Sequence, residues 1–407
     1  MLSTPSPTPA RPGGPKPGSV MRAIAALALA SFASQALVRA ADTLLPQIAA
    51  DFAITVGAAS IVITAYALTH GSMQFIAGPL ADRFGKYRTV ALACALSAVT
   101  VAVCGLAGSL DSLTAARFAS GLTVAWILPI SLAYIGDVVP YEQRQQLLGR
   151  FLAAQVLGQM FGQAAGGIIG DYFGWRTMFF LLAAMLALAG IALAIELATN
   201  PVTHAAAERS KAQGLSAGYK AVLSKPWARI VLLTVCLEGA LFQGVFPFVS
   251  ADLHLRFGLS FTAIGMIIGV FAIGGLVYAA LVRLLMHRLG QAGIANAGGL
   301  IMGLSFLALA IEPVWLFAPV ATLGIGLGFF SLHNTLQTEG TQMTPEARGT
   351  AVALFASVYF LGQTAGVALA APIMDRYGAQ PLFAFVALAL PLLALWFTAR
   401  LKRRQKA

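Results

Sequence analysis

The residues of this chain best able to do chemistry are two charged side chains, Arg39 and Asp42, at the end of the apolar stretch 21–45. That stretch can cross a membrane, because a transmembrane helix needs about 20 apolar residues. A carboxylate at membrane depth costs about 3 kcal/mol on insertion scales, so it is kept only if it is paired or if its proton is used. Arg39 lies three residues before Asp42 on the same helix face. The pattern predicts a structural ion pair or a site that exchanges a proton.

A third charged residue, Arg117, lies within the apolar stretch 112–137. A cation held near a carboxylate keeps the acid ionised until the pairing is disturbed. We therefore predict that Asp42 with Arg117 is the main proton-coupling pair, with Arg39 as a further member. In the alternative interpretation Arg117 extends toward the membrane interface, since Asp111 is only six residues away.

Other polar side chains inside apolar stretches are candidates for lining a cavity. Tyr66, His70 and Gln74 recur every four residues and therefore share one helix face. The remaining candidates are equally enclosed by apolar sequence: Gln155, Gln159, Gln163, Glu238, Gln243, His333, Asn334, Gln337, Tyr359 and Gln363. The alternative for each is hydrogen bonding between helices, which buried polar groups in lipid require. Glu238 is the strongest candidate, as the one acid deep in the second half of the sequence.

The sequence contains no pattern typical of catalysis. It has no phosphate-binding loop, zinc-ligand spacing or nucleophile elbow, so we expect no enzyme activity, no cofactor and no metal. Cys94, Cys104 and Cys236 lack paired spacing and are interpreted as packing residues.

Composition predicts the elements that must position these residues. Apolar residues make up 58% of the 407-residue chain and charged residues 10%, whereas a soluble domain carries about 25% charged residues. We expect an all-α membrane protein whose spans lie at 21–45, 56–80, 88–109, 112–137, 146–170, 176–198, 228–251, 261–286, 292–311, 314–336, 348–372 and 379–400.

The basic residues predict an orientation. We count 21 of the 26 Lys and Arg on one face of this arrangement, which places both termini in the cytoplasm by the positive-inside rule. The net charge of +11 then reflects the orientation in the membrane. A nucleic-acid partner is not expected, because the sequence has no basic soluble module. The expected organisation is a disordered terminus (1–20), a six-helix bundle (21–198), a cytoplasmic connector with a short amphipathic helix (199–227), a second bundle (228–400) and a basic tail (401–407).

The two predicted bundles share a sequence repeat. Glu142-Gln-Arg144 recurs as Glu346-Ala-Arg348, Gly158 as Gly362 and Asp171 as Asp375, and the arginines, glycines and aspartates of these pairs are all 204 residues apart. A second pair, Pro46 to Asp51 and Pro247 to Asp252, agrees at a slightly different separation. Two homologous halves in a membrane protein favour a solute transporter, because substrate sites form where such halves meet.

The segment Gly78-Pro79-Leu80-Ala81-Asp82-Arg83-Phe84-Gly85-Lys86 resembles the signature loop of the major facilitator superfamily. His287-Arg288-Leu289-Gly290 is a second, less complete copy of this loop. The resemblance implies a fold of two pseudo-symmetric six-helix bundles with twelve transmembrane helices. It also implies that Asp82 docks near the start of a late helix, which Thr344-Pro345 is expected to cap.

Three further segments are similar to the drug:proton antiporter branch of that superfamily. They are Asp42 with Pro46 four residues later, Arg117 four residues before Gly121, and Gly162-Gln163-Ala-Ala-Gly166-Gly167. The last matches Gly-Pro-x-x-Gly-Gly with glutamine in place of proline. With Gly158, these glycines are expected to let another helix approach closely.

The resemblance also implies gating residues at the cytoplasmic end. We expect them to be Gly78, Asp82, Arg83, Gly85, Lys86, Asp137, Glu142, Arg144, Glu346 and Arg348, with Glu339 nearby. Solvated surface charge is the alternative, since exposed ion pairs contribute little.

The function expected is proton-coupled export of a small organic compound across the inner membrane by a monomer, through alternating access. Its partners would be the small-molecule substrate, protons and the lipid bilayer. The alternative is a uniporter or proton symporter that imports a small organic anion bound by Arg39 and Arg117. A sensor that binds ligand without transport is a third hypothesis.

Overall fold

The computed structural model describes residues 17–139, 141–204 and 215–406. Within these ranges the side chains of 17, 78–80, 82, 83, 141, 142, 145, 146, 215, 216 and 406 are not described. This group includes four of the predicted gating residues, Gly78, Asp82, Arg83 and Glu142, whose contacts therefore lie outside the described part of the structure.

The described residues form helices joined by short loops. The N-terminal half (17–199) contains α1 (Pro17–Asp51), α2 (Val56–Ala59), α3 (Ile61–Phe84), α4 (Lys86–Gly105), α5 (Leu110–Val124), α6 (Ile127–Val138), α7 (Tyr141–Phe173) and α8 (Trp175–Thr199). The turn η1 (Pro201–His204) and helix α9 (Leu215–Ser224) follow. The C-terminal half (226–406) contains α10 (Pro226–Glu238), η2 (Gly239–Gln243), α11 (Pro247–Phe257), α12 (Phe261–Ile311), η3 (Trp315–Phe317), α13 (Ala318–Gln342), η4 (Pro345–Ala347), α14 (Arg348–Tyr377) and α15 (Gln380–Lys406).

The helices agree with the predicted spans, with differences at their ends. In the described part of the chain, ten helices are long and apolar enough to cross a membrane. One of these ten, α12, consists of two helices broken at Gly290 and covers two of the predicted spans. Helix α7 is not among the ten but covers the predicted span 146–170. With α7 included, the helices cover all twelve predicted spans. Helix α1 begins at Pro17, so residues 17–20 are helical, although they were expected to be disordered. The predicted tail is helical as far as Lys406.

The start of α14 differs from the prediction. Thr344 precedes the single turn η4, its hydroxyl makes no capping hydrogen bond, and α14 itself begins at Arg348. The expectation that Thr344 caps this helix was wrong, because the proline starts a 3-10 turn and the α-helix follows only after it.

The two copies of the signature loop adopt related turns. Gly85 and Gly290 are 205 residues apart, and both have a positive φ, of 87° and 64°. A residue with a Cβ is strained in this conformation, so each turn needs glycine. The second copy therefore lacks the acidic residue, with His287 in place of Asp82, but keeps the glycine that makes the turn.

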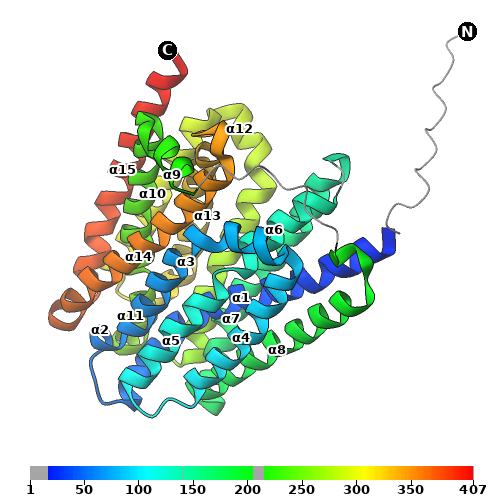
Figure 1. Ribbon diagram of the computed structural model, residues 1–407. Helices are drawn as coiled ribbons and strands as arrows, with labels where there is room; N and C mark the ends of the chain where they lie inside the picture. The colour runs from blue at the N-terminus through cyan, green and yellow to red at the C-terminus, as the bar shows by residue number, and fades with distance from the viewer. Residues whose placement is uncertain (1–16, 140, 205–214, 407) are drawn as a thin grey trace, which may run out of the picture.

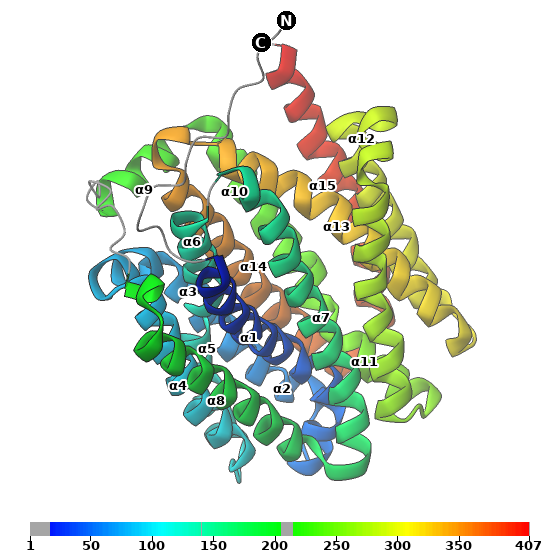
Figure 2. The ribbon, with the colours of Figure 1, turned by 90° about the vertical axis from the view of Figure 1, so that its right-hand side faces the viewer.

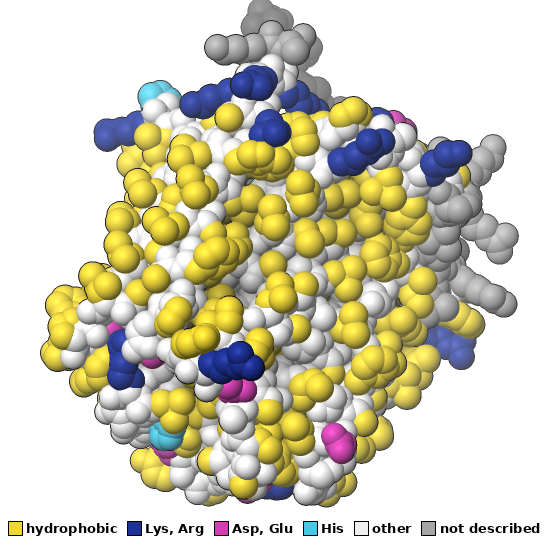
Figure 3. All heavy atoms as spheres, turned by 90° about the vertical axis from the view of Figure 1, so that its left-hand side faces the viewer, with side chains coloured by type: hydrophobic (Ala, Val, Ile, Leu, Met, Phe, Trp, Pro, Cys, Tyr) yellow, Lys and Arg dark blue, Asp and Glu magenta, His cyan; other side chains and the backbone are white. Residues whose placement is uncertain are grey.

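The halves pack on each other through α7 against α12 and α14 against α3. Figure 2 shows the blue helices of the N-terminal half on the left, α12, α13 and α15 on the right, and α7 and α14 between them. One face of the molecule is largely covered by hydrophobic side chains, with Lys and Arg gathered along its upper edge (Figure 3). An apolar belt with charged ends is the surface expected of a protein in a bilayer.

Within each half the glycines let helices approach to backbone contact. A Cβ on any of four glycines would overlap a carbonyl oxygen of the neighbouring helix, and the contacts match at a separation of 204 residues: Gly158 on Phe32, Gly162 on Ala36, Gly362 on Cys236 and Gly366 on Ala240. Small residues at such crossings are what allow close packing in a membrane. The repeat is thus a repeat of packing as well as of sequence.

Candidate functional site

The site is centred on Arg39 near the middle of the molecule. Its Nη1 lies 3.3 Å from Oδ2 of Asp42, and both residues are almost completely buried. The same Nη1 donates a hydrogen bond to Oε1 of Gln243 in the other half at 2.6 Å. The guanidinium also lies 5.9 Å from the ring centres of Phe246 and Phe271. Arg39 therefore joins the carboxylate of one half to an amide of the other.

The helix containing Gln243 is interrupted at this point. Residues Gly239–Gln243 form a π-helical turn between α10 and α11, and such turns often occur at functional sites. Gly239 lies directly against the backbone of Tyr359, where a Cβ would overlap the carbonyl oxygen. Close by, Ser250 donates a hydrogen bond of 2.5 Å to the backbone oxygen of Asp42, again across the two halves.

Arg117 occupies a separate position. It is 1% exposed, its Nε donates to the carbonyl oxygen of Val62 at 3.3 Å, and its guanidinium lies 4.2 Å from the ring centre of Tyr66. Among the described side chains no ion pair joins Arg117 to Asp42 or to Asp111. Its Nη1 has no hydrogen-bond partner there either. Asp42 pairs with Arg39 because the two lie one helical turn apart.

A second pair of ionisable side chains lies in the C-terminal half. Nδ1 of His333 is 2.7 Å from Oε2 of Glu238, which is fully buried. The His333 ring packs on Phe329 at 4.8 Å and on Tyr359 at 4.9 Å between centres. Oε1 of Glu238 and the Tyr359 hydroxyl lack partners in the described part of the structure. Glu238 was the acid favoured from sequence, and the structure adds the histidine that holds it.

Aromatic side chains fill the space between the two pairs. Phe242 packs on Phe329 at 4.7 Å and on Phe271 at 5.7 Å, which links the rings beside His333 to those beneath Arg39. The Arg39–Asp42 ion pair and the Glu238–His333 pair are thus separated by a mainly apolar cluster, in which charges interact more strongly than in water.

Candidates in the N-terminal half also reach toward the other half. The His70 ring lies 4.4 Å from that of Phe360 in α14, and its Nε2 is 3.5 Å from Nε2 of Gln74. Within the described residues, Nδ1 of His70 and the hydroxyl of Tyr66 have no partner. Buried polar groups without partners are unusual and are candidates for contact with a ligand or water.

The glutamine candidates of α7 and α14 lie in different environments. Gln159 donates a hydrogen bond to Gln35 at 3.1 Å. Gln155, Gln163 and Gln363 are buried, and the amide nitrogens of the first two lack partners within the described chain. Gln35 was missed by the sequence analysis. Its position four residues before Arg39, on the same helix face, was the available signal.

The last two cavity candidates lie on α13 beyond His333. Asn334 is half-buried and Gln337 is exposed. The structure therefore leaves Gln337 outside the buried polar residues, while Asn334 is partly enclosed.

At the end near the C-terminus, several charged side chains have partners in the described part of the structure. Asp137 pairs with Lys86 at 2.5 Å, and Arg144 donates to the backbone oxygen of Gly136. Lys225 pairs with Glu346. Glu339 accepts hydrogen bonds from Trp227, Gln291 and Arg404, and Arg348 is exposed. The predicted network between the halves stays a prediction, since several of its members lie outside the described residues.

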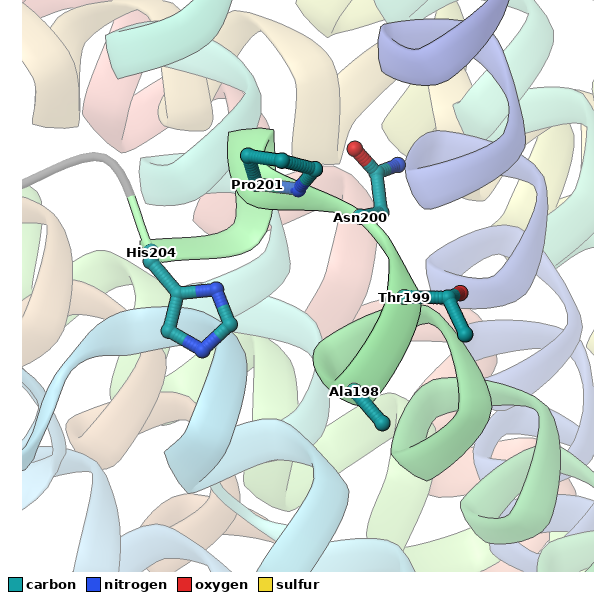
Figure 4. Close-up of a pocket in the computed structure, with 5 residues that line it drawn as sticks. All are labelled: Ala198, Thr199, Asn200, Pro201 and His204. Atoms are coloured by element: carbon teal, nitrogen blue, oxygen red, sulfur yellow. The ribbon is translucent and has the colours of Figure 1, made fainter.

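Two surface pockets lie away from this site. One, of about 460 Å³, is lined by Val282, Arg283, Met286 and His287. The other, of about 270 Å³, is formed by residues 198–201 and His204 at the end of α8 (Figure 4). There the amide of Asn200 donates to the backbone of Ser19 and to Glu196, so its polar group serves to join α1 to α8. Neither pocket is lined by one of the cavity candidates predicted from the sequence.

Comparison with known proteins finds related transporters. The chain is 28% identical over 335 residues to an uncharacterized MFS-type transporter, YceJ, of Bacillus subtilis (strain 168), covering 80% of this chain and 83% of that protein. It is 25% identical over 374 residues to a probable sugar efflux transporter of Pasteurella multocida (strain Pm70), covering 87% of each.

A solved structure shows the same fold. The nucleoside transporter NupG superposes with a TM-score of 0.74 at 15% identity, over 93% of this chain and 99% of that one. The family model "Major Facilitator Superfamily" matches residues 27–367. The membrane-spanning helices, the signature turns and this match lead to one conclusion: the chain is a multi-pass membrane protein that belongs to the Major Facilitator Superfamily of transporters.

Proposed function

We propose that this transporter exports a small organic compound from the cytoplasm in exchange for protons, and that Asp42 is the proton site. The observation that supports this most is the position of Arg39, which contacts Asp42 in one half and Gln243 in the other. A change in the charge of Asp42 would act directly on a contact between the halves. Coupling requires such a link, because a ligand shifts a conformational equilibrium only through different interactions in the two states.

The proposed cycle follows the charge on Asp42. A proton arriving from outside neutralises the carboxylate and removes most of its attraction for Arg39. Arg39 then keeps Gln243 and the rings of Phe246 and Phe271 as partners. When Asp42 releases the proton to the cytoplasm, the ion pair with Arg39 forms again. Arg117, held by Val62 and Tyr66, adds a second positive charge that favours the ionised acid.

The direction and the substrate rest on other observations. The similarity to a probable sugar efflux transporter supports export. The predicted cavity residues combine amides and phenols with aromatic rings and one acid, Glu238. This mixture suits a compound with both polar and apolar parts. We place both termini in the cytoplasm, because Lys and Arg gather at the end that carries the C-terminus. The proposed unit is a monomer in the cell membrane.

Transport in everted membrane vesicles tests the proposal. The vesicles are acidified inside, and a pH-sensitive dye reports proton release when a lipophilic cation, a neutral drug, a sugar or an organic anion is added. We expect one class to release protons, and we expect Asp42→Asn to abolish this release while substrate still binds. The matched control is Asp51→Asn, an acid at the end of the same helix that pairs with exposed Arg176. Full gradient-driven transport in Asp42→Asn would overturn the proposal.

One observation favours a second candidate function. Nη1 of Arg117 is buried without a partner among the described residues, so it could bind the carboxylate of an imported organic anion. An importer predicts anion uptake that is lost in Arg117→Ala, together with no proton release in the vesicle experiment above.

A further inference from the structure

Two equivalent aspartates at the end opposite the C-terminus bind across the two halves. Asp171, near the end of α7, accepts hydrogen bonds from the backbone N–H groups of Phe261 (2.9 Å) and Thr262 (2.6 Å) at the start of α12. Asp375, near the end of α14, has the reciprocal arrangement. It accepts from the N–H of Gly57 and the hydroxyl of Thr55, both at 2.7 Å. Figure 1 shows this end of α14 beside α2.

The arrangement is a duplicated one. The aspartates are 204 residues apart, and the helix starts they bind, at Thr55 and Ser260, are 205 apart. Both hydroxyls also cap their own helix, Thr55 on the N–H of Ala58 and Ser260 on that of Ala263. Thr55 precedes the short helix α2, which Ser60 joins to α3, and Ser260 precedes α12. A helix start presents free N–H groups and partial positive charge, so a carboxylate there is stabilising.

The backbones beside these contacts leave no room between the halves. A Cβ on Gly57 would overlap the carbonyl oxygen of Ala371, and one on Gly167 would overlap that of Phe261. A hydrogen bond is lost when its atoms separate beyond about 3.5 Å. Both aspartate contacts can therefore exist only while the helix pairs α2–α14 and α7–α12 are closed at this end.

We propose that Asp171 and Asp375 form a two-aspartate latch that holds this end of the transporter closed. The latch rests on the proposed function only in requiring that this end opens during transport. It involves neither the proton on Asp42 nor the substrate. Both aspartates are exposed, so water replaces the lost hydrogen bonds when the end opens. Each contact should then shift the equilibrium by about twofold to fivefold, which is weak enough to open in every cycle.

Distance measurement between spin labels tests the latch on the full-length protein in lipid. Cys94, Cys104 and Cys236 are first replaced by alanine, and labels are attached at Leu106→Cys and Val314→Cys. These exposed positions lie in loops at the same end, one in each half. We expect Asp171→Asn and Asp375→Asn each to increase the fraction with the longer distance about twofold to fivefold. The double variant should show about the product of the two effects.

Matched variants separate the latch from a general loss of charge or structure. Asp111→Asn removes an exposed aspartate at the same end and should leave the distances unchanged. Asp171→Glu and Asp375→Glu keep the charge and should retain more of the short distance than the asparagine variants do. The latch is wrong if the double asparagine variant matches the parent, or if the glutamate variants or Asp111→Asn shift the distances as far. Because the readout needs no gradient, Asp42→Asn can lose coupling while the latch stays intact, so the two proposals fail separately.

Discussion

The two halves keep equivalent packing but place their buried charges differently. At the separation of 204 residues at which the glycine contacts match, Arg39 of the N-terminal half corresponds to the uncharged Gln243 of the C-terminal half. At the position of Glu238 it is the C-terminal half that has the ionisable residue, because the corresponding residue of the N-terminal half is Ser34. Charges inside a membrane are expensive, so the scaffold keeps one only where that half uses it. The difference supports our proposal that the glycine contacts serve the fold and that the buried polar pairs serve transport.

The largest effects should come from the shared packing. Gly162→Ala and Gly366→Ala each place a Cβ onto a backbone carbonyl, of Ala36 and Ala240. Overpacking of this kind costs about 1–3 kcal/mol and sometimes more, so we expect both variants to lose most of the folded protein. The measurement is the monodisperse fraction on size exclusion in detergent. Gly269→Ala is the control, because its Cβ would meet only Ala164 at 3.9 Å. A large difference between Gly162→Ala and Gly366→Ala would mean that the halves do not pack equivalently.

The next prediction makes the charged position resemble its uncharged equivalent. Arg39→Gln gives position 39 the residue found at 243 and leaves Asp42 buried without its cation. Breaking a buried pair costs about 3–5 kcal/mol, so we expect a lower melting temperature in detergent and no transport. Adding Asp42→Asn should restore much of the stability without restoring proton release. Recovery of proton release in the double variant would show that this pair does not couple the proton.

The Glu238–His333 pair should affect binding more than coupling. Glu238→Gln replaces the carboxyl group that His333 contacts by an amide of the same shape. A hydrogen bond to a charged group contributes about 1.5–3 kcal/mol, so we expect KM to rise about tenfold or more with proton coupling retained. Ser34→Ala at the equivalent position, where the hydroxyl bonds only to the backbone of Ser31 within the described chain, should change KM little. Loss of coupling in Glu238→Gln with KM unchanged would assign the proton to the C-terminal half.

The smallest effect concerns acids at the end opposite the C-terminus. Asp51 pairs with Arg176 at an exposed site, whereas Glu312 is buried beside Arg256, which also lies 3.4 Å from Asp252. Burial raises the pKa of Glu312 to about 7, although Arg256 opposes the shift. An ordinary glutamate has a pKa of about 4.3, so between these values the folded protein holds a proton that the unfolded chain releases. The free energy of unfolding should therefore fall as pH rises through this window.

Melting in detergent at pH 5 and pH 7.5 measures this difference. We expect the parent to melt about 1 °C lower at pH 7.5, since about 1 kcal/mol shifts the melting temperature of a protein of this size by roughly that amount. Glu312→Gln should remove that part of the pH dependence, and Asp51→Asn should leave it in place. A Glu312→Gln variant with the parent's pH dependence would place the titration elsewhere.

Much of the fold could be predicted because it depends on local chemistry. Stretches of about 20 apolar residues form helices in a membrane whatever their neighbours, because their backbone groups must be satisfied within the segment. The pairing of Arg39 with Asp42 is equally local, since both lie on one helix face. The repeat at 204 residues also predicted that Gly158 and Gly362 would act alike.

The errors and omissions have a different origin. Asp42 was expected to pair chiefly with Arg117, and the contact of Arg39 with Gln243 was not foreseen. Nor were the partners of Glu238 and of Asp171. Each of these contacts joins residues from helices far apart in the sequence, and the choice among several possible partners depends on how the helices are packed.

The sequence by itself therefore determined the helices, the duplication and the residues that are costly to bury. Hydropathy and helical periodicity act over one or two turns and can be read along the chain. Only the tertiary structure decided which buried charge meets which partner and which aspartates connect the halves. Those choices arise where glycines bring two helices into contact and a side chain finds a partner within about 3 Å, a condition set by packing in three dimensions.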